Sequence, residues 1–120
     1  MTIKLYILLN SDIDLTVGQA CAQSSHITHI IIDEIVRSAY EIMPTPDYYI
    51  KYLEWCGDSV TIVKKTSLQE LEKLKNSPYC KFFYDDVYDK KLRIKIRHLT
   101  AIGFYPGCID SQLLSDYSLM

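Results

Sequence analysis

The chain is poor in the residues that mark several common kinds of site. Its 120 residues include only four glycines and four cysteines, and no two cysteines form a C-x-x-C pair. The scattered thiols lack the close spacing of a zinc site and are expected to stay reduced. The sequence also has no Gly-rich phosphate loop, no G-x-S-x-G and no H-E-x-x-H. Common nucleotide-binding and hydrolase motifs are therefore absent.

Long apolar runs and a targeting segment are lacking as well. No apolar run reaches the roughly 18 residues that suggest a membrane span. The N-terminus has neither the basic start nor the small-residue cleavage site of a signal peptide. We therefore expect a cytoplasmic protein with no membrane contact, and we expect no cofactor. The formal net charge is −2, so any contact with nucleic acid must come from a local basic patch.

The composition is that of an ordinary globular domain. Hydrophobic residues make up 48% of the chain and charged residues 23%, which argues against disorder. A chain of this length buries about two thirds of its unfolded surface, and no internal repeat or low-complexity segment appears. We predict a single domain over residues 1–120.

Hydrophobic patterning predicts four strands and four helices in the order β-α-α-β-α-β-β-α. The strands are expected at residues 3–9, 60–63, 80–84 and 92–102, and the helices at about 16–42, 47–57, 67–77 and 110–116. Strands separated by helices imply parallel crossovers, whereas the last two strands can form a hairpin or lie apart. The predicted fold class is α/β, with a four-stranded mixed β-sheet sandwiched between α-helices.

The first predicted helix begins with residues that suit a site. Thr16 is expected as its N-cap, and Gln19 completes a capping box. Gln19, Gln23 and His26 recur at spacings of three and four, so they share one stripe of the helix. That stripe is either the lip of a site or the solvated face of a packed helix, and periodicity alone favours the packed helix.

Acidic and basic residues are concentrated on the last two predicted strands. Asp85 and Asp86 end the third strand and are expected near the same edge of the sheet as Asp12. A carboxylate there acts as a general base or caps a turn. A basic stripe of Arg93, Lys95 and Arg97, which Lys64, Lys65, Lys90 and Lys91 could extend, is usually a solvated strand face. As a functional surface it would contact the phosphates of structured RNA.

Two histidines raise a metal-dependent alternative. His26 and His29 stand three residues apart on the predicted helix, a spacing that could place both on one metal ion. No third ligand lies nearby in the sequence. We therefore predict no metal site and rank a metal-dependent hydrolase last.

Residues 10–26 resemble a motif of a known enzyme family. They read N-S-D-I-D-L-T-V-G-Q-A-C-A-Q-S-S-H, which is similar to R-x-D-L-x-M-x-x-G-K-x-x-A-Q-x-x-H of the archaeal/eukaryotic-type peptidyl-tRNA hydrolases. The two agree at Asp12, Gly18, Ala22, Gln23 and His26. The strand that ends at Lys64, W-C-G-D-S-V-T-I-V-K, also resembles one in the family.

The resemblance extends to an acidic residue and includes clear departures. A gapless count back from T-A-I-G, residues 100–103, places Asp86 on the aspartate of the family segment D-A-G-R-T-Q. The family's catalytic lysine is Gln19 here, its arginine before the turn is Asn10, and the threonine of its site is Lys90. Lys90 could supply the missing charge if it reaches the same pocket as Gln19 and Asp86.

The resemblance implies hydrolysis of the ester between a peptide and the 3′ end of tRNA, a mixed sheet between helices, and a homodimer. It implies Asp86 as the catalytic carboxylate that handles water, with Gln19, Gln23 and His26 as the adjoining wall. The expected substrate-binding residues are Asp12, Lys64, Lys90, Lys91, Arg93, Lys95 and Arg97. The alternative is a catalytically degenerate module that binds tRNA or a protein, which the residues at positions 19 and 90 favour.

Overall fold

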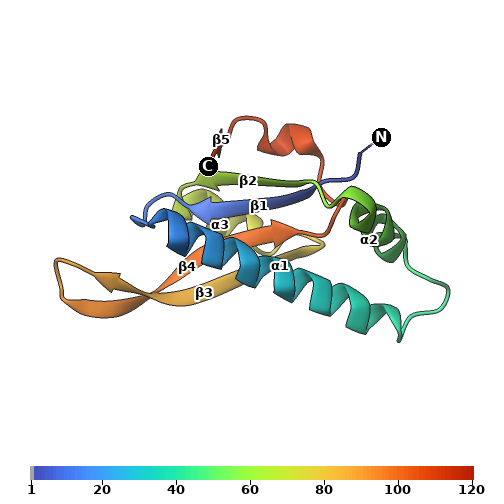
Figure 1. Cartoon of the computed structure of the whole chain (residues 1–120), viewed down its shortest axis with the longest axis horizontal. Helices are drawn as coiled ribbons and strands as arrows, with labels where there is room; N and C mark the ends of the chain where they lie inside the picture. The colour runs from blue at the N-terminus through green and yellow to red at the C-terminus, as the bar shows by residue number, and fades with distance from the viewer. Residues whose placement is uncertain (1) are drawn as a thin grey trace.

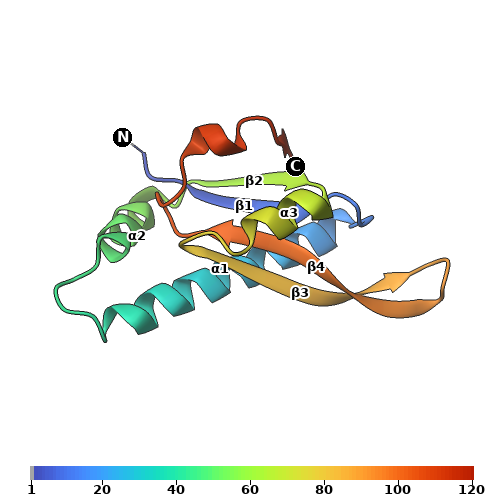
Figure 2. The ribbon, with the colours of Figure 1, turned by 180° about the vertical axis from the view of Figure 1, so that it is seen from behind.

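The computed structural model describes residues 2–120 as a mixed β-sheet with helices on both faces (Figures 1 and 2). This arrangement confirms the α/β class. Along the chain the elements are β1 (Leu5–Asn10), α1 (Val17–Ala39), α2 (Asp47–Asp58), β2 (Thr61–Thr66), α3 (Leu68–Leu74), β3 (Cys80–Asp89), β4 (Ile94–Phe104), the short 3₁₀ helix η1 (Ser111–Leu114) and β5 (Ser118–Leu119).

The sheet has five strands in the order β3-β4-β1-β2-β5, so the prediction of four strands is wrong. β2 runs parallel to β1, and the pairs β1–β4, β3–β4 and β2–β5 are antiparallel. The fifth strand is a two-residue segment beside Lys64 and Lys65, too short to show any periodicity in the sequence. The helix expected at 110–116 is only the 3₁₀ turn η1.

The central strand β1 is buried along its whole length and supplies both halves of the core. Its odd-numbered residues face α1 and α2, where they pack with a stripe on α1 and with Trp55. Its even-numbered residues, Tyr6 and Leu8, face α3 and pack with Leu71 and Leu114. Alternating side chains of one strand thus meet helices on opposite sides.

Helix α1 lies unusually close to the sheet where it crosses β4. A Cβ atom at Gly103 would lie 2.6 Å from Ile31 Cδ1 and 3.1 Å from Ile27 Cγ1. Both isoleucines are fully buried. Only a residue without a side chain fits between the strand and the helix at this point.

Helix α1 begins with the capping box that the sequence predicted. The Gln19 backbone N–H donates to Thr16 Oγ1 at 3.1 Å, and the Thr16 N–H donates to Gln19 Oε1 at 2.9 Å. The helix ends at Ala39, slightly before the predicted end near residue 42.

Among the helices of residues 2–120, none combines the length and the apolar composition that a membrane span requires.

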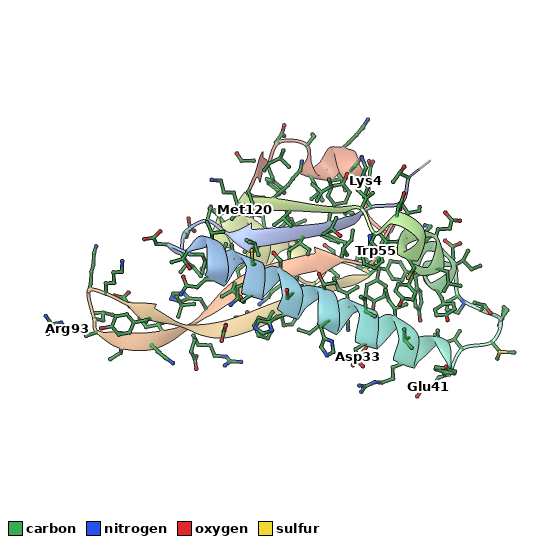
Figure 3. The ribbon with its side chains drawn as sticks, in the orientation of Figure 1. Lys4, Asp33, Glu41, Trp55, Arg93 and Met120 are labelled. Atoms are coloured by element: carbon green, nitrogen blue, oxygen red, sulfur yellow. The ribbon has the colours of Figure 1, made fainter. Side chains whose placement is uncertain are left out.

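Strands β3 and β4 form a hairpin that is longer than predicted. β3 continues to Asp89, five residues beyond its predicted end, whereas β4 begins at Ile94 and runs to Phe104, two residues later at each end than predicted. The outer half of the hairpin extends beyond the helices in both views (Figures 1 and 2). Arg93 lies at its tip and points away from the rest of the protein (Figure 3). Phe83 pairs with Ala101 but Tyr84 pairs with Leu99, so Thr100 is an extra residue in a β-bulge.

Candidate functional site

The site is built around Gln23, a side-chain amide on the buried stripe of α1 with an exposed fraction of only 5%. Its Nε2 donates a hydrogen bond to Asp85 Oδ2 at 2.8 Å. Its Oε1 accepts a hydrogen bond from Thr100 Oγ1 at 2.6 Å. Because both ends of the amide have partners, its orientation is fixed, and it joins α1 to β3 and β4.

Asp85 carries the negative charge of the site. The hydrogen bond from Gln23 is the largest cause that lowers the pKa of the Asp85 carboxyl. The backbone N–H of Asp86, which donates to Asp85 Oδ1 at 2.9 Å, and the nearby Arg97 guanidinium act in the same direction. The carboxylate is therefore ionised at neutral pH, where it acts as an electrostatic partner rather than a strong base.

Two imidazoles lie on the α1 side of the sheet near this carboxylate. The His26 ring packs on the Phe83 ring with centroids 4.9 Å apart and an interplanar angle of 32°. His98 on β4 is the register partner of Asp85, and cross-strand partners place their side chains on the same face. His98 was not predicted as a site residue, although alternation along β4 places it on the same side as Ile94 and Ile96.

A cleft of about 450 Å³ opens next to these residues, between the loop after β1 and the β3–β4 hairpin. His98 lies in its wall and connects it to the Asp85 region. The other polar residues in its wall are Asp12, Asp14, Asp89, Lys90 and Lys91. The structure thus brings three predicted substrate-binding residues, Asp12, Lys90 and Lys91, to one cleft. Asp12 also has a structural contact, because its Oδ2 accepts a hydrogen bond from the Leu68 N–H at the start of α3.

Asp86 lies on the opposite face of the sheet, so the expectation that it shares a cleft with Gln23 and His26 is wrong. Its Oδ1 lies 4.0 Å from Arg97 Nη1, and both side chains are more than half exposed. The physical reason is the alternation of β3, which sends Asp85 toward α1 and Asp86 away from it. Because neighbouring strand residues point to opposite faces, a shift of one residue in such a count changes the face to which the acid is assigned.

Gln19 does not join the cluster either. Its side chain is exposed and engaged in the N-terminal capping box of α1. Neither Gln19 nor Asp86 lines the cleft that contains Lys90. The structure therefore does not bring Lys90 together with these two residues, as the hypothesis of a replacement charge requires.

The predicted basic residues fall into separate groups. Lys64 Nζ donates a hydrogen bond to the Leu114 carbonyl oxygen at 2.7 Å. This bond joins β2 to η1, so Lys64 has a structural contact. Lys95 and Arg97 project to the same face as Asp86, opposite the Gln23 cluster. The predicted extension of the basic stripe by other lysines is therefore not continuous, because Lys95 and Arg97 share the face of Asp86 and Lys90 and Lys91 line the cleft.

The metal-dependent alternative gains no support from the geometry. Within residues 2–120, no group of three or more His, Cys, Asp or Glu side chains is placed to hold a metal ion. His26 and His29 thus lack a third ligand in the described part of the chain.

The lowered pKa of Asp85 predicts a pH dependence of stability. Because the folded state binds the Asp85 proton more weakly than the unfolded state, this stabilisation is complete above the ordinary aspartate pKa. It is lost as the pH falls through the lower pKa of the folded state. We expect Asp85→Asn to remove this contribution, so the urea midpoint of the variant falls less between pH 6 and pH 2 than that of the wild type. Equal falls in both proteins would show that the carboxylate is not stabilised.

Neither a scan against protein-family models nor a search of curated proteins finds a match for this chain. The function proposed below therefore rests on the geometry of the cluster and on the residues of the 10–26 motif.

Proposed function

We propose that the chain hydrolyses the ester bond of peptidyl-tRNA, as a divergent member of the archaeal/eukaryotic-type peptidyl-tRNA hydrolases. The hydrogen bond between Gln23 and Asp85 is the observation that carries the proposal, because it joins the resembling motif to an acid 62 residues away. That acid is Asp85, in place of the Asp86 that the sequence count selected. Peptidyl-tRNA is then the partner, and the homodimer that the resemblance implies stays a prediction.

In this proposal the reaction is the attack of water on the ester carbonyl. The His26 imidazole takes the proton from water, and the ionised Asp85 carboxylate stabilises the imidazolium that forms. The new C–O bond produces a tetrahedral oxyanion, and its collapse breaks the bond to the ribose oxygen of tRNA, which leaves with the proton from His26. Gln23 holds Asp85 in place. Lys90 and Lys91 in the cleft wall offer positive charge to the phosphates of the tRNA end.

The turnover of this site is expected to be slow. The position of the family's catalytic lysine holds Gln19, whose side chain stays in the helix cap. The loss of one oxyanion donor lowers the rate by about 10²–10³-fold. A rate well below that of an enzyme with lysine at this position is the expected consequence.

The position of the Gln19 side chain in the helix cap also favours a second candidate. This candidate is a catalytically degenerate module that binds tRNA or a protein partner. In such a module the Gln23–Asp85–Thr100 contacts hold α1 to the sheet and have no chemical role. The capping box that occupies Gln19 is the specific observation in its favour.

Cleavage of an N-acetylated aminoacyl-tRNA separates the two candidates. We expect slow release of free tRNA by the purified chain, unaffected by a chelator. Gln19→Lys should raise the rate by up to about 10²-fold. A lysine side chain cannot accept the hydrogen bond that the Thr16 N–H donates to Gln19 Oε1, so its ammonium group is free to leave the helix cap. Activity in Gln19→Lys alone would indicate a degenerate module, and no activity in either protein would overturn the hydrolase proposal.

A further inference from the structure

The face of the β3–β4 hairpin opposite α1 carries a cluster of aromatic and basic side chains. From β3 it includes Phe82 and Tyr84, whose rings meet edge to face with centroids 5.9 Å apart. From β4 it includes Arg97, whose guanidinium carbon lies 6.0 Å from the centre of the Tyr84 ring. Lys95, two residues before Arg97, lies on the same side of the strand. We call these four residues the aromatic-basic face.

The rings of this face are fixed in position and accessible. Lys75, just beyond α3, donates from Nζ to the Tyr84 hydroxyl at 2.8 Å and lies 5.5 Å from the Phe82 ring centroid. Phe82 is still 43% exposed. An exposed aromatic ring that is held rigidly by its neighbours offers a flat surface at little cost in side-chain entropy.

Three cations, Lys75, Lys95 and Arg97, lie on or beside this face together with the carboxylates of Glu72 and Asp86. The local charge is therefore positive, although the chain as a whole has a net charge of −2. Lys95 takes part in no salt bridge within residues 2–120. Arg97 meets Asp86 only at 4.0 Å, with side chains 69% and 56% exposed. Such a loose, solvated pair is weak, so the guanidinium can turn to a phosphate.

We propose that the aromatic-basic face binds single-stranded RNA. A base stacks on Phe82, the neighbouring phosphates contact Arg97 and Lys95, and the Asp86 carboxylate accepts a hydrogen bond from a ribose 2′-hydroxyl. The five residues from Phe82 to Asp86 span roughly 13 Å of strand, which suits a short extended segment of RNA. Stacking requires bases that are free of a partner strand, so a single strand fits this face better than a duplex.

This surface is separate from the proposed catalytic cluster, which lies on the other side of the sheet. Its failure and the failure of the hydrolase proposal are therefore distinguishable. Asp85→Asn should leave RNA binding unchanged. Phe82→Leu should leave ester hydrolysis of a minimal substrate unchanged, because Phe82 lies outside the cluster and the cleft.

Fluorescence anisotropy with a labelled oligouridylate of eight nucleotides tests the proposal. We expect binding at low salt that weakens as salt is added. Phe82→Leu should weaken binding by about 5- to 150-fold, the loss of one stacked base. Arg97→Gln should weaken it and reduce the salt dependence. Arg37→Gln is the matched control, because Arg37 is an equally exposed arginine paired with Asp33 on α1.

Several results would overturn the proposal. They are equal affinity for an RNA duplex of the same length, equal affinity for the corresponding DNA strand, and wild-type binding by Phe82→Leu and Arg97→Gln. The absence of binding at low salt would do so as well. Thermal melting of each variant verifies that it is folded, so a loss of binding can be attributed to the altered side chain.

Discussion

Asp85→Asn is expected to lower the rate of peptidyl-tRNA cleavage by about 10²–10⁴-fold, the contribution that positioned acid–base groups make. The substitution removes the charge that stabilises an imidazolium at His26. The asparagine amide keeps an oxygen that can accept a hydrogen bond from Gln23 Nε2. In the wild type, Gln23 Nε2 donates to Asp85 Oδ2 at 2.8 Å. Single-turnover cleavage of N-acetylated aminoacyl-tRNA measures the effect.

The neighbouring residue provides a matched control for this prediction. Asp86→Asn removes the same charge one position along the chain, but on the opposite face and beside Arg97. We expect it to change the cleavage rate by less than about twofold, because an exposed charge in a loose pair contributes little. A large loss of activity in Asp86→Asn with full activity in Asp85→Asn would contradict the assignment of the acid made from the structure.

Gly103→Ala is expected to destabilise the protein by about 1–3 kcal/mol, the usual cost of overpacking. The added methyl group would lie 2.6 Å from Ile31 Cδ1 and 3.1 Å from Ile27 Cγ1. Both side chains are fully buried, so neither can turn into solvent, and α1 must move away from β4. Urea unfolding at neutral pH measures the change.

A double-mutant cycle assigns this cost to one contact. Ile31→Val removes the Cδ1 atom and alone should cost about 0.5–1.5 kcal/mol. In the double variant the new methyl group occupies part of the vacated space, so the two costs should sum to more than the measured loss. Gly57→Ala is the control, because a Cβ there meets nothing within 4 Å and should stabilise α2 by about 0.5–1 kcal/mol. Additive costs in the cycle would show that the close approach at Gly103 is not what limits the packing.

Much of the fold could be predicted because its patterns are local. The capping residues Thr16 and Ser67 mark the starts of α1 and α3 by the chemistry of their own side chains. The apolar run of β1 marks a central strand in the same way. β5 could not be predicted, because its two residues become a strand only through pairing with β2.

The candidate site could be predicted only in part, because it depends on which face a strand residue occupies. The spacing of Gln23 and His26 predicts that they share one stripe of α1, but it does not distinguish the lip of a site from a packed face. The choice between Asp85 and Asp86 depended on how the distant β3 lies against α1, which no pattern within β3 reveals. The role of Lys64 could not be predicted for a similar reason, because its hydrogen-bond partner is a backbone carbonyl 50 residues away.

Because Thr100 is the additional residue of the β-bulge, we expect the β3–β4 pairing to persist when this one residue is deleted. Because Phe83 and Tyr84 already pair with Ala101 and Leu99, deleting Thr100 would leave a regular ladder with every other partnership intact. What would disappear is the hydroxyl that donates to Gln23. A lineage of such proteins could therefore gain or lose this polar link in one step, without rebuilding the sheet around it.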